Sequence, residues 1–259
     1  MAGLNIIVCV KSVVLDAPDG IIIRTTDSCE LNPFDRPAIE AAIKLREEKG
    51  GQITALSMGP EAACLGLYEA LSMGVDQAVL FSDPKLAGSD TLATSTALGS
   101  AIKKLGPYAL VIFGAKTADS DTGQVGPQTA VYLGLPLVTG VYDIQPNGSS
   151  LIVERRIDEF MERYEIALPG IITIHPSAFQ PRDSSLMVIN EAFTDKMIKK
   201  VSLDHLDLSS EQVGKSGSPT RVLAMKKVSR ERKCDFIAGS MEEQAEELTR
   251  KLKETGLIG

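Results

Sequence analysis

The first half of the chain alternates between short apolar runs and longer amphipathic segments. The apolar runs cover residues 4–10, 53–57, 78–82 and 108–113. Continuous runs of this length are typical of strands buried on both faces of a sheet. The segments that follow these runs carry apolar residues at helical spacing, near residues 34–48, 61–73, 90–105 and 128–133. This alternation predicts an α/β fold with a doubly wound, mostly parallel sheet.

Local signals add detail near the amino terminus. Asn32 is expected to cap the helix at 34–48, with Pro33 at its first position. Residues 20–24 are expected to form a short hairpin or an edge strand.

After residue 135 the apolar runs continue without helices between them. Residues 137–142, 151–155 and 164–168 predict an antiparallel extension of the sheet, and residues 171–175 a last strand. Core character is lost beyond Pro181, and residues 209–219 are expected to be a linker. Residues 241–254 form a helical pattern with a narrow apolar stripe, which favours packing on a partner subunit over docking on its own domain.

Composition then excludes several classes of function. The chain is 44% hydrophobic and 24% charged, with a net charge of −7, which argues against binding to nucleic acid or to an anionic membrane. No apolar run reaches the roughly 18 residues of a membrane span, so we expect a cytoplasmic protein without membrane insertion. The four cysteines are scattered and the two histidines lie far apart, so reduced thiols and no metal site are predicted.

The most informative stretch is residues 114–127, which is rich in glycine and hydroxyl groups. It lies between an apolar strand and a helical segment, where backbone N–H groups and the positive end of a helix dipole point at a ligand. A nucleotide phosphate fits such a cradle. Cys9 and Met58 follow two other predicted parallel strands, so all three breaks should meet at one sheet edge. A purely structural helix cap is the alternative reading of the loop.

Two aspartates in this loop need another role, because they would repel a phosphate. Asp119 and Asp121 are expected to cap the turn and helix or to accept hydrogen bonds from ribose or adenine. Thr122, Gln124 and the N–H groups of residues 123–126 would then hold the phosphates. No G-x-G-x-x-G, P-loop or nucleophile–base set is present, so no catalytic residue is predicted.

Several of these motifs together resemble the β subunit of electron-transfer flavoproteins. They are Val8-Cys9-Val10-Lys11, Asn32-Pro33-Phe34-Asp35, Ser57-Met58-Gly59-Pro60, Asp119-x-Asp121-Thr122-x-Gln124-x-Gly126 and the helix that ends at Glu254. The resemblance covers nearly the whole chain. It implies a heterodimer with an α subunit that carries FAD in a mobile domain, and a nucleotide bound to this chain.

The resemblance leaves the nucleotide open between two types. In respiratory members it is a structural AMP, and in electron-bifurcating members it is a second FAD that is reduced by NADH. Thr122, Val125 and Pro127 resemble the bifurcating type. Gly123 and Gly126 are expected to leave room for a pyrophosphate, which AMP does not require.

Carried over residue by residue, the resemblance implies a full set of nucleotide contacts. They are Cys9, Asn32, Phe34, Asp35, Met58, Asp119, Ser120, Asp121, Thr122, Gly123, Gln124, Val125, Gly126, Pro127, Gln128, Thr129 and Ala130. Cys9 stands where the family often has alanine.

The resemblance also implies partners. Gln180-Pro181-Arg182 resembles the family's docking loop, so Leu186 is expected to anchor a flavin-dependent dehydrogenase. Residues 190–200 depart from the family pattern, which leaves that dehydrogenase open between an acyl-CoA dehydrogenase-like enzyme and another one. Ferredoxin or flavodoxin is the expected low-potential acceptor.

The resulting prediction is an electron-carrier subunit of an NADH-dependent, flavin-based bifurcating complex. Residues 1–185 form its nucleotide-binding domain, and residues 186–259 form a docking loop, a linker and a helix that packs on the α subunit. Two alternatives are a non-bifurcating β subunit that holds AMP, and a stand-alone adenine-nucleotide-binding domain.

Overall fold

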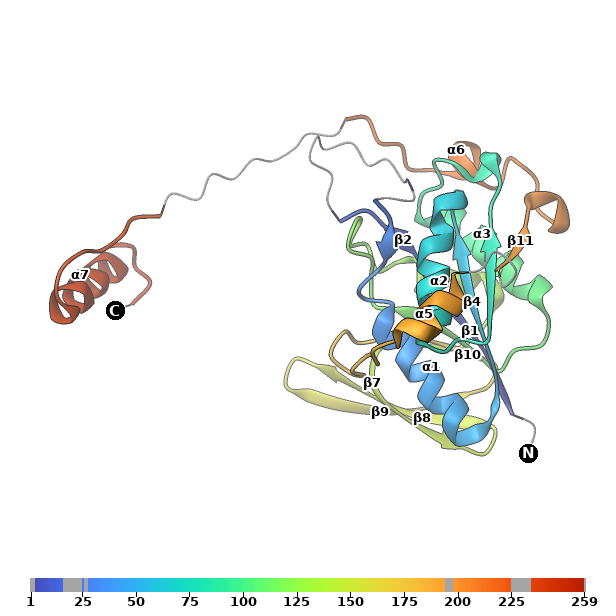
Figure 1. Ribbon diagram of the computed structural model, residues 1–259, viewed down its shortest axis with the longest axis horizontal. Helices are drawn as coiled ribbons and strands as arrows, with labels where there is room; N and C mark the ends of the chain where they lie inside the picture. The colour runs from blue at the N-terminus through green and yellow to red at the C-terminus, as the bar shows by residue number, and fades with distance from the viewer. Residues whose placement is uncertain (1–2, 16–24, 26–27, 194–197, 225–233, 259) are drawn as a thin grey trace. The chain divides into compact units, whose positions relative to one another are not determined.

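One sheet of nine strands organises the computed structural model, which describes residues 3–15, 25, 28–193, 198–224 and 234–258 (Figure 1). Its strands are β1 (Leu4–Cys9), β4 (Gly51–Met58), β5 (Gln77–Phe81), β6 (Leu110–Gly114), β7 (Leu137–Asn147), β8 (Ser150–Ile157), β9 (Phe160–Ala167), β10 (Gly170–Ile174) and β11 (Ile198–Val201). Two further short strands, β2 (Ser12–Val13) and β3 (Glu30–Leu31), pair with each other in antiparallel fashion.

Helices connect and cover the strands. They are α1 (Arg36–Lys49), α2 (Cys64–Met73), α3 (Thr91–Leu105), α4 (Val125–Leu133), α5 (Leu186–Ala192), α6 (Gly214–Gly217) and α7 (Met241–Glu254). Short 3-10 turns are η1 (Glu61–Ala63), η2 (Pro84–Leu86) and η4 (Leu203–His205).

The strand order is β11-β5-β4-β1-β6-β10-β7-β8-β9. Pairing is parallel from β11 through to β7, and the β7–β8 and β8–β9 pairs are antiparallel. The predicted α/β fold, with its parallel sheet and antiparallel extension, is therefore confirmed.

Each central strand contributes side chains to two cores, which explains the unbroken apolar runs. Val8 of β1 packs with Ile39 of α1 on one face, whereas Ile7 packs with Ile102 of α3 on the other. All four side chains are at most 4% exposed. Figure 1 shows α1, α2 and α5 over the near face of the sheet.

Several local predictions are wrong. The first helix starts at Arg36 after Asp35, not at Pro33, and Asn32 makes long-range hydrogen bonds instead of capping it. The helix after the loop begins at Val125, three residues earlier than expected. The predicted hairpin at residues 20–24 lies outside the described residues.

The region after residue 181 also differs from the prediction. Residues 171–175 do not end the sheet, because β11 pairs in parallel with β5 at its edge. Residues 209–219 are not a free linker, since Val213 is fully buried and Ser218 Oγ accepts a hydrogen bond from the Asp90 N–H at 2.8 Å.

The chain divides into two compact units, residues 1–223 and 224–259. The described residues between 186 and 223 were expected in the partner-binding arm. They belong instead to the same compact unit as the sheet. The second unit contains the predicted helix as α7, none of whose residues is buried. Among the described residues, the helices are too short or too polar to cross a membrane.

Candidate nucleotide-binding site

The carboxyl ends of β1, β4 and β6 meet where the strand order reverses. The chain runs from β1 outward through β4 and β5, and then returns to place β6 on the other side of β1. Cys9 pairs with Leu56 on one side and with Phe113 on the other. The fold therefore brings the predicted strand-end residues to one edge, which is where open parallel sheets bind ligands.

Asn32 fastens the loop after β6 to this edge. Its Nδ2 donates to the Lys116 carbonyl at 2.9 Å, and its Oδ1 accepts from the Ala118 N–H at 3.1 Å. The Asn32 N–H donates to the Lys11 carbonyl at 2.9 Å. The Asn32 side chain is fully buried, and these three hydrogen bonds fix the loop to the end of β1.

Asp35, the residue before α1, contacts both the end of β1 and the start of the loop. Its Oδ2 accepts the Lys11 N–H at 2.8 Å, and the residue is 4% exposed. The Gly114 backbone packs so closely on it that a side chain at 114 would collide with the Asp35 carboxyl and the Phe34 carbonyl. Burial raises the pKa of Asp35 to about 7 against the effect of the Lys11 and Asn32 hydrogen bonds.

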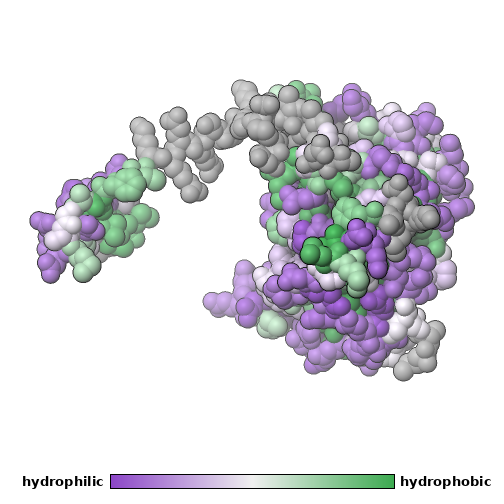
Figure 2. All heavy atoms as spheres, viewed as in Figure 1, coloured by the Kyte–Doolittle hydropathy of each residue, from purple (hydrophilic) through white to green (hydrophobic). Residues whose placement is uncertain are grey.

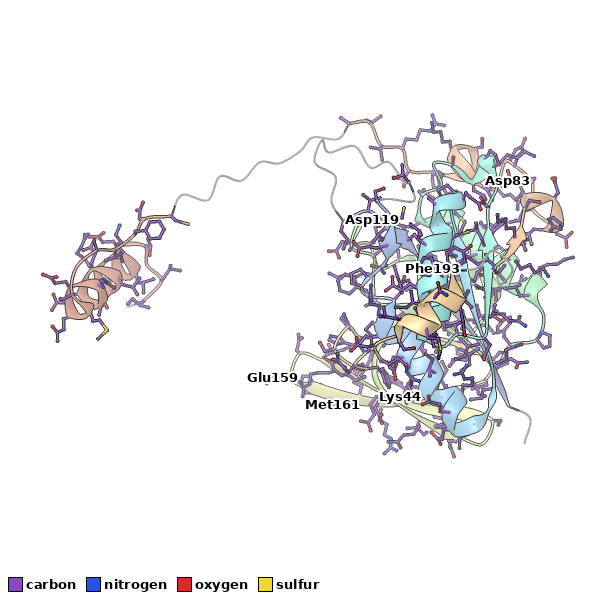
Figure 3. All side chains as sticks on the ribbon, viewed as in Figure 1. Lys44, Asp83, Asp119, Glu159, Met161 and Phe193 are labelled. Carbon is purple, nitrogen blue, oxygen red and sulfur yellow. The ribbon has the colours of Figure 1, made fainter. Side chains whose placement is uncertain are left out.

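Two lysines neutralise the loop aspartates. Lys11 Nζ lies 2.7 Å from Asp119 Oδ1, and the Asp119 side chain is only 3% exposed. Figure 3 shows Asp119 beside β2, the strand that follows Lys11. Lys116 Nζ lies 2.6 Å from Asp121 Oδ1. Neither aspartate caps α4, because its N-cap residue is Gln124 and it has no capping side chain, so that part of the expectation is wrong. The expected hydrogen bonds from ribose or adenine stay a prediction.

Sequence reasoning missed Lys11 and Lys116 as members of this site. Lys116 Nζ also stands 5.1 Å from the centre of the Phe34 ring. One signal was available: Lys11 directly follows a predicted strand end. Its partner Asp119 is 108 residues away, so local pattern could not pair them.

The amino terminus of α4 has features of an anion site. No side chain caps α4, as is also the case for α1 and α2, whereas Asp90 caps α3 and Ser240 caps α7. Gln124 Oε1 instead accepts a hydrogen bond from Thr91 Oγ1 at 3.1 Å. The first-turn N–H groups of a helix have no partner inside it, so an uncapped terminus offers them to a ligand or to solvent.

The structure gives a reason for glycine at positions 123 and 126. Gly123 has a φ of 61°, a region that favours glycine. A Cβ at 126 would stand 3.1 Å from Thr173 Cγ2 and 3.3 Å from Phe113 Cγ. A side chain at 126 would therefore crowd Thr173 and Phe113, which gives Gly126 a packing reason to be glycine, and room for a pyrophosphate against its backbone stays a prediction.

The predicted contact residues fall into three groups by exposure. Exposed ones are Ser120, Asp121, Thr122 and Gln124. Partly exposed ones are Phe34, Met58, Asp119, Gly123, Val125, Pro127 and Gln128. Buried ones are Cys9, Asn32, Asp35, Gly126, Thr129 and Ala130. Thr129 Oγ1 donates to the Val125 carbonyl at 2.7 Å and Ala130 packs in the core, so both side chains build α4 itself.

Cys9 has the properties of a packing residue. It is 6% exposed, and burial followed by the charge of Asp35 raises the pKa of its thiol. A thiolate is the nucleophilic form of cysteine, so this environment disfavours a nucleophile. Among the described residues, the four cysteines form no disulfide, and no cluster of histidine, cysteine or carboxylate side chains is suited to a metal ion.

Leu186 lies away from this edge, at the start of α5, which packs on α2. It is 86% exposed, next to Met187 at 71%. Green hydrophobic atoms reach the surface over α5 in Figure 2. At the other end of the segment, the Phe193 ring, labelled in Figure 3, stacks on Tyr68 with ring centres 5.0 Å apart.

The chain is similar to known proteins over nearly its whole length. The family described as "Electron transfer flavoprotein domain" matches residues 19–206. The chain is 37% identical to the electron transfer flavoprotein subunit beta of Thermoanaerobacterium thermosaccharolyticum, an alignment that covers 98% of this chain and 100% of the relative.

Two further relatives carry more specific names. The acryloyl-CoA reductase electron transfer subunit gamma of Anaerotignum propionicum is 35% identical, over 98% of this chain and 100% of the relative. The caffeyl-CoA reductase-Etf complex subunit CarD of Acetobacterium woodii is also 35% identical, with the same coverage.

Proposed function

Because the chain belongs to the electron-transfer flavoprotein family, as a β subunit, we propose that it binds FAD at the carboxyl edge of β1, β4 and β6 and accepts hydride from NADH there. The electrons go to the FAD of an α subunit and its partner dehydrogenase, and to a low-potential acceptor such as ferredoxin or flavodoxin. The two relatives named for acryloyl-CoA and caffeyl-CoA reductases favour a dehydrogenase that acts on a CoA thioester.

The observation that carries the nucleotide proposal is the uncapped amino terminus of α4 beside a loop fixed by Asn32 and Lys11. Such a terminus attracts phosphate through its N–H groups and its dipole. In our proposal the N–H groups of residues 123–126, with Thr122 and Gln124, hold the phosphates.

The charges around the loop are compatible with an anionic ligand. The carboxylates of Asp119 and Asp121 would oppose a phosphate if they were unpaired, but Lys11 and Lys116 each face one of them. The net charge of the four groups is zero, so they do not offset the positive field of the α4 amino terminus.

The chain's own residues serve to bind, orient and shield the nucleotide. Bound FAD supplies the chemistry, because it accepts a hydride and releases electrons singly. Asn32 and Asp35 hold the backbone of the site in place, and no side chain of the site is required to transfer a proton. The exposed polar side chains at 120–124 form the outer wall.

A structural AMP is the second candidate for this site. AMP would present one phosphate to the cradle, whereas FAD would present two. The relatives that are named as subunits of CoA reductase complexes favour FAD instead. Both ligands use the same phosphate cradle.

Partner contacts are assigned to two other parts of the chain. We assign α7, whose apolar residues Met241 and Leu248 are 88% and 50% exposed, to packing on the α subunit. An amphipathic helix with no buried residue gains most of its stability from such packing. We assign Leu186 to contact with the dehydrogenase.

Counting nucleotides tests the proposal. The chain is co-purified with its α subunit, denatured, and its FAD and AMP are quantified by chromatography. We expect two FAD per heterodimer, no AMP, and bleaching of flavin absorbance by NADH. One FAD with one AMP would replace FAD by AMP in this subunit.

A pair of variants locates the bound nucleotide. Thr122→Val changes an exposed hydroxyl of the loop, whereas Thr139→Val makes the same change on β7. Only the first should lower nucleotide content. Equal nucleotide content in both would argue against a site at the loop.

A further inference from the structure

Asp35 is a buried carboxyl at a junction of three segments that border the candidate site. The end of β1 supplies the Lys11 N–H at 2.8 Å, the turn before α1 supplies Asp35 itself, and the start of the loop supplies the Gly114 backbone against it. The carboxyl has no structural need to be charged, because a protonated acid still accepts the Lys11 N–H through its second oxygen.

The charged groups around Asp35 belong to the same junction. Among the described residues, Lys11, Asp119 and the Cys9 thiol interact electrostatically with it. Arg36 follows it in the chain but forms an ion pair with Glu69. Lys116 faces Asp121.

These neighbours leave Asp35 near balance between its two forms. Burial, the largest cause, and the charge of Asp119 favour the protonated acid, whereas the Lys11 N–H, Asn32 and the Lys11 charge favour the carboxylate. Its pKa of about 7 places both forms in the neutral range. A small added field therefore changes the proton occupancy of this one group.

A bound nucleotide adds such a field. Its phosphate brings negative charge to the loop whose residues Lys116 and Ala118 are tied to Asn32. Asp119 of that loop already disfavours the carboxylate form of Asp35. A second negative charge in the same loop acts in the same direction.

We propose that Asp35 is a positioning residue that takes up a proton from solvent when an anionic nucleotide binds, so that nucleotide affinity depends on pH. The inference rests on the proposed site but not on the choice between FAD and AMP. Protonation removes the repulsion between Asp35 and Asp119 while the hydrogen bond from Lys11 is kept.

The sign of the pH effect follows from linkage. If binding takes up a proton, affinity rises as the pH falls through the range in which free Asp35 titrates. We expect roughly threefold tighter binding, or more, at pH 6 than at pH 8.

Isothermal titration calorimetry tests this directly. The full-length chain is freed of nucleotide in concentrated bromide and titrated at pH 7 with AMP and with FAD, in buffers of different ionisation enthalpy. The slope of the observed enthalpy against the buffer enthalpy gives the number of protons taken up. We expect a positive fraction of a proton at pH 7 and none near pH 9.

Two variants assign the proton. Asp35→Asn keeps the shape and an acceptor for the Lys11 N–H. Its binding of FAD should be proton-neutral, and with AMP, whose phosphate itself titrates at about pH 6, the uptake due to Asp35 is the difference between wild type and variant. Glu47→Gln is the control, because it removes an exposed carboxylate near the other end of α1. It should keep the uptake of the wild type.

The outcomes separate the two proposals. Binding of either nucleotide without proton uptake in the wild type would overturn the inference and leave the proposed function standing. Loss of uptake in Glu47→Gln, or its persistence in Asp35→Asn, would assign the proton elsewhere and overturn it too. Absence of any nucleotide binding would overturn both. If Asp35→Asn does not fold, the wild-type comparison of pH 7 with pH 9 still decides.

Discussion

Arg182 donates two parallel hydrogen bonds to the Glu40 carboxylate, from Nε to Oε2 at 2.9 Å and from Nη2 to Oε1 at 3.0 Å. The Glu40 side chain is 4% exposed and belongs to α1, whereas Arg182 precedes α5. This pair fixes the base of the segment that presents Leu186. Its counterpart is the stack of Phe193 on Tyr68 at the far end.

Arg182→Met should therefore destabilise the protein. A buried carboxylate would lose its bidentate partner, so the free energy of unfolding should fall by about 2 kcal/mol. Urea denaturation measures it. Glu47→Gln removes only the exposed contact of Arg182 with Glu47 and should cost less than about 1 kcal/mol. Equal losses in the two variants would contradict this account.

Lys11→Met should destabilise the nucleotide loop more than Lys116→Met. The first variant removes the ammonium group from a buried Asp119, for which we expect about 1 to 3 kcal/mol of lost stability. The second variant removes the ammonium group from Asp121, which is exposed, and should lower the free energy of unfolding by less than about 1 kcal/mol. Chemical denaturation of both variants provides the comparison, and the reverse order would refute the assigned roles.

Asn32→Asp should loosen the loop without unfolding the sheet. The carboxylate still accepts from the Ala118 N–H but cannot donate to the Lys116 carbonyl. Hydrogen exchange of a peptide covering 114–124 should become faster, while a peptide from β4 should keep its protection. Unchanged exchange at 114–124 would mean that Asn32 does not hold the loop.

Asp35→Asn should change how stability depends on pH. The pKa of Asp35 is about 7 in the folded chain against an ordinary 3.8, so between these values only the folded chain keeps the proton. Stability from this group is thus lost as the pH rises from about 4 to about 7. Across that range the variant should gain roughly 2 to 4 kcal/mol relative to wild type, measured by denaturation at several pH values. A difference that is constant with pH would contradict the prediction.

Leu186→Ala should impair electron transfer but not folding. The side chain is 86% exposed, so unfolding should change by less than about 0.5 kcal/mol. If Leu186 anchors the dehydrogenase, its loss should lower the rate of electron transfer about tenfold or more. Val131→Ala on α4, 83% exposed, is the control and should leave that rate unchanged.

Much of the fold could be predicted because the central strands are buried on both faces. β11 was missed because its sequence, Ile-Lys-Lys-Val, exposes two lysines at the sheet edge and carries little apolar signal. Residues 209–219 resemble a linker in composition, yet the buried side chains of Val213 and Ser218 fix them. Short polar segments are placed by such single contacts, which composition does not reveal.

The sequence predicted that the strand ends and the loop meet at one sheet edge, but not the contacts among their side chains. Strand ends, glycines and the start of α4 are local features, and they brought Cys9, Met58 and the loop together. Asn32 donates a hydrogen bond to Lys116, 84 residues away, whereas its local sequence indicated a helix cap. Which of two polar partners a side chain chooses depends on the assembled fold.

The position of β10 bears on how this chain is made. β10 is hydrogen-bonded to β6 on one side and to β7 on the other, yet it is the latest of the three in sequence. During synthesis from the amino terminus, β7, β8 and β9 leave the ribosome before the strand that joins them to the main sheet. Until residues 170–174 follow, the nascent protein exposes the edges of β6 and β7 that β10 later covers, and such edges are favoured points of aggregation. Translation speed between residues 115 and 174 should therefore affect the yield of soluble protein.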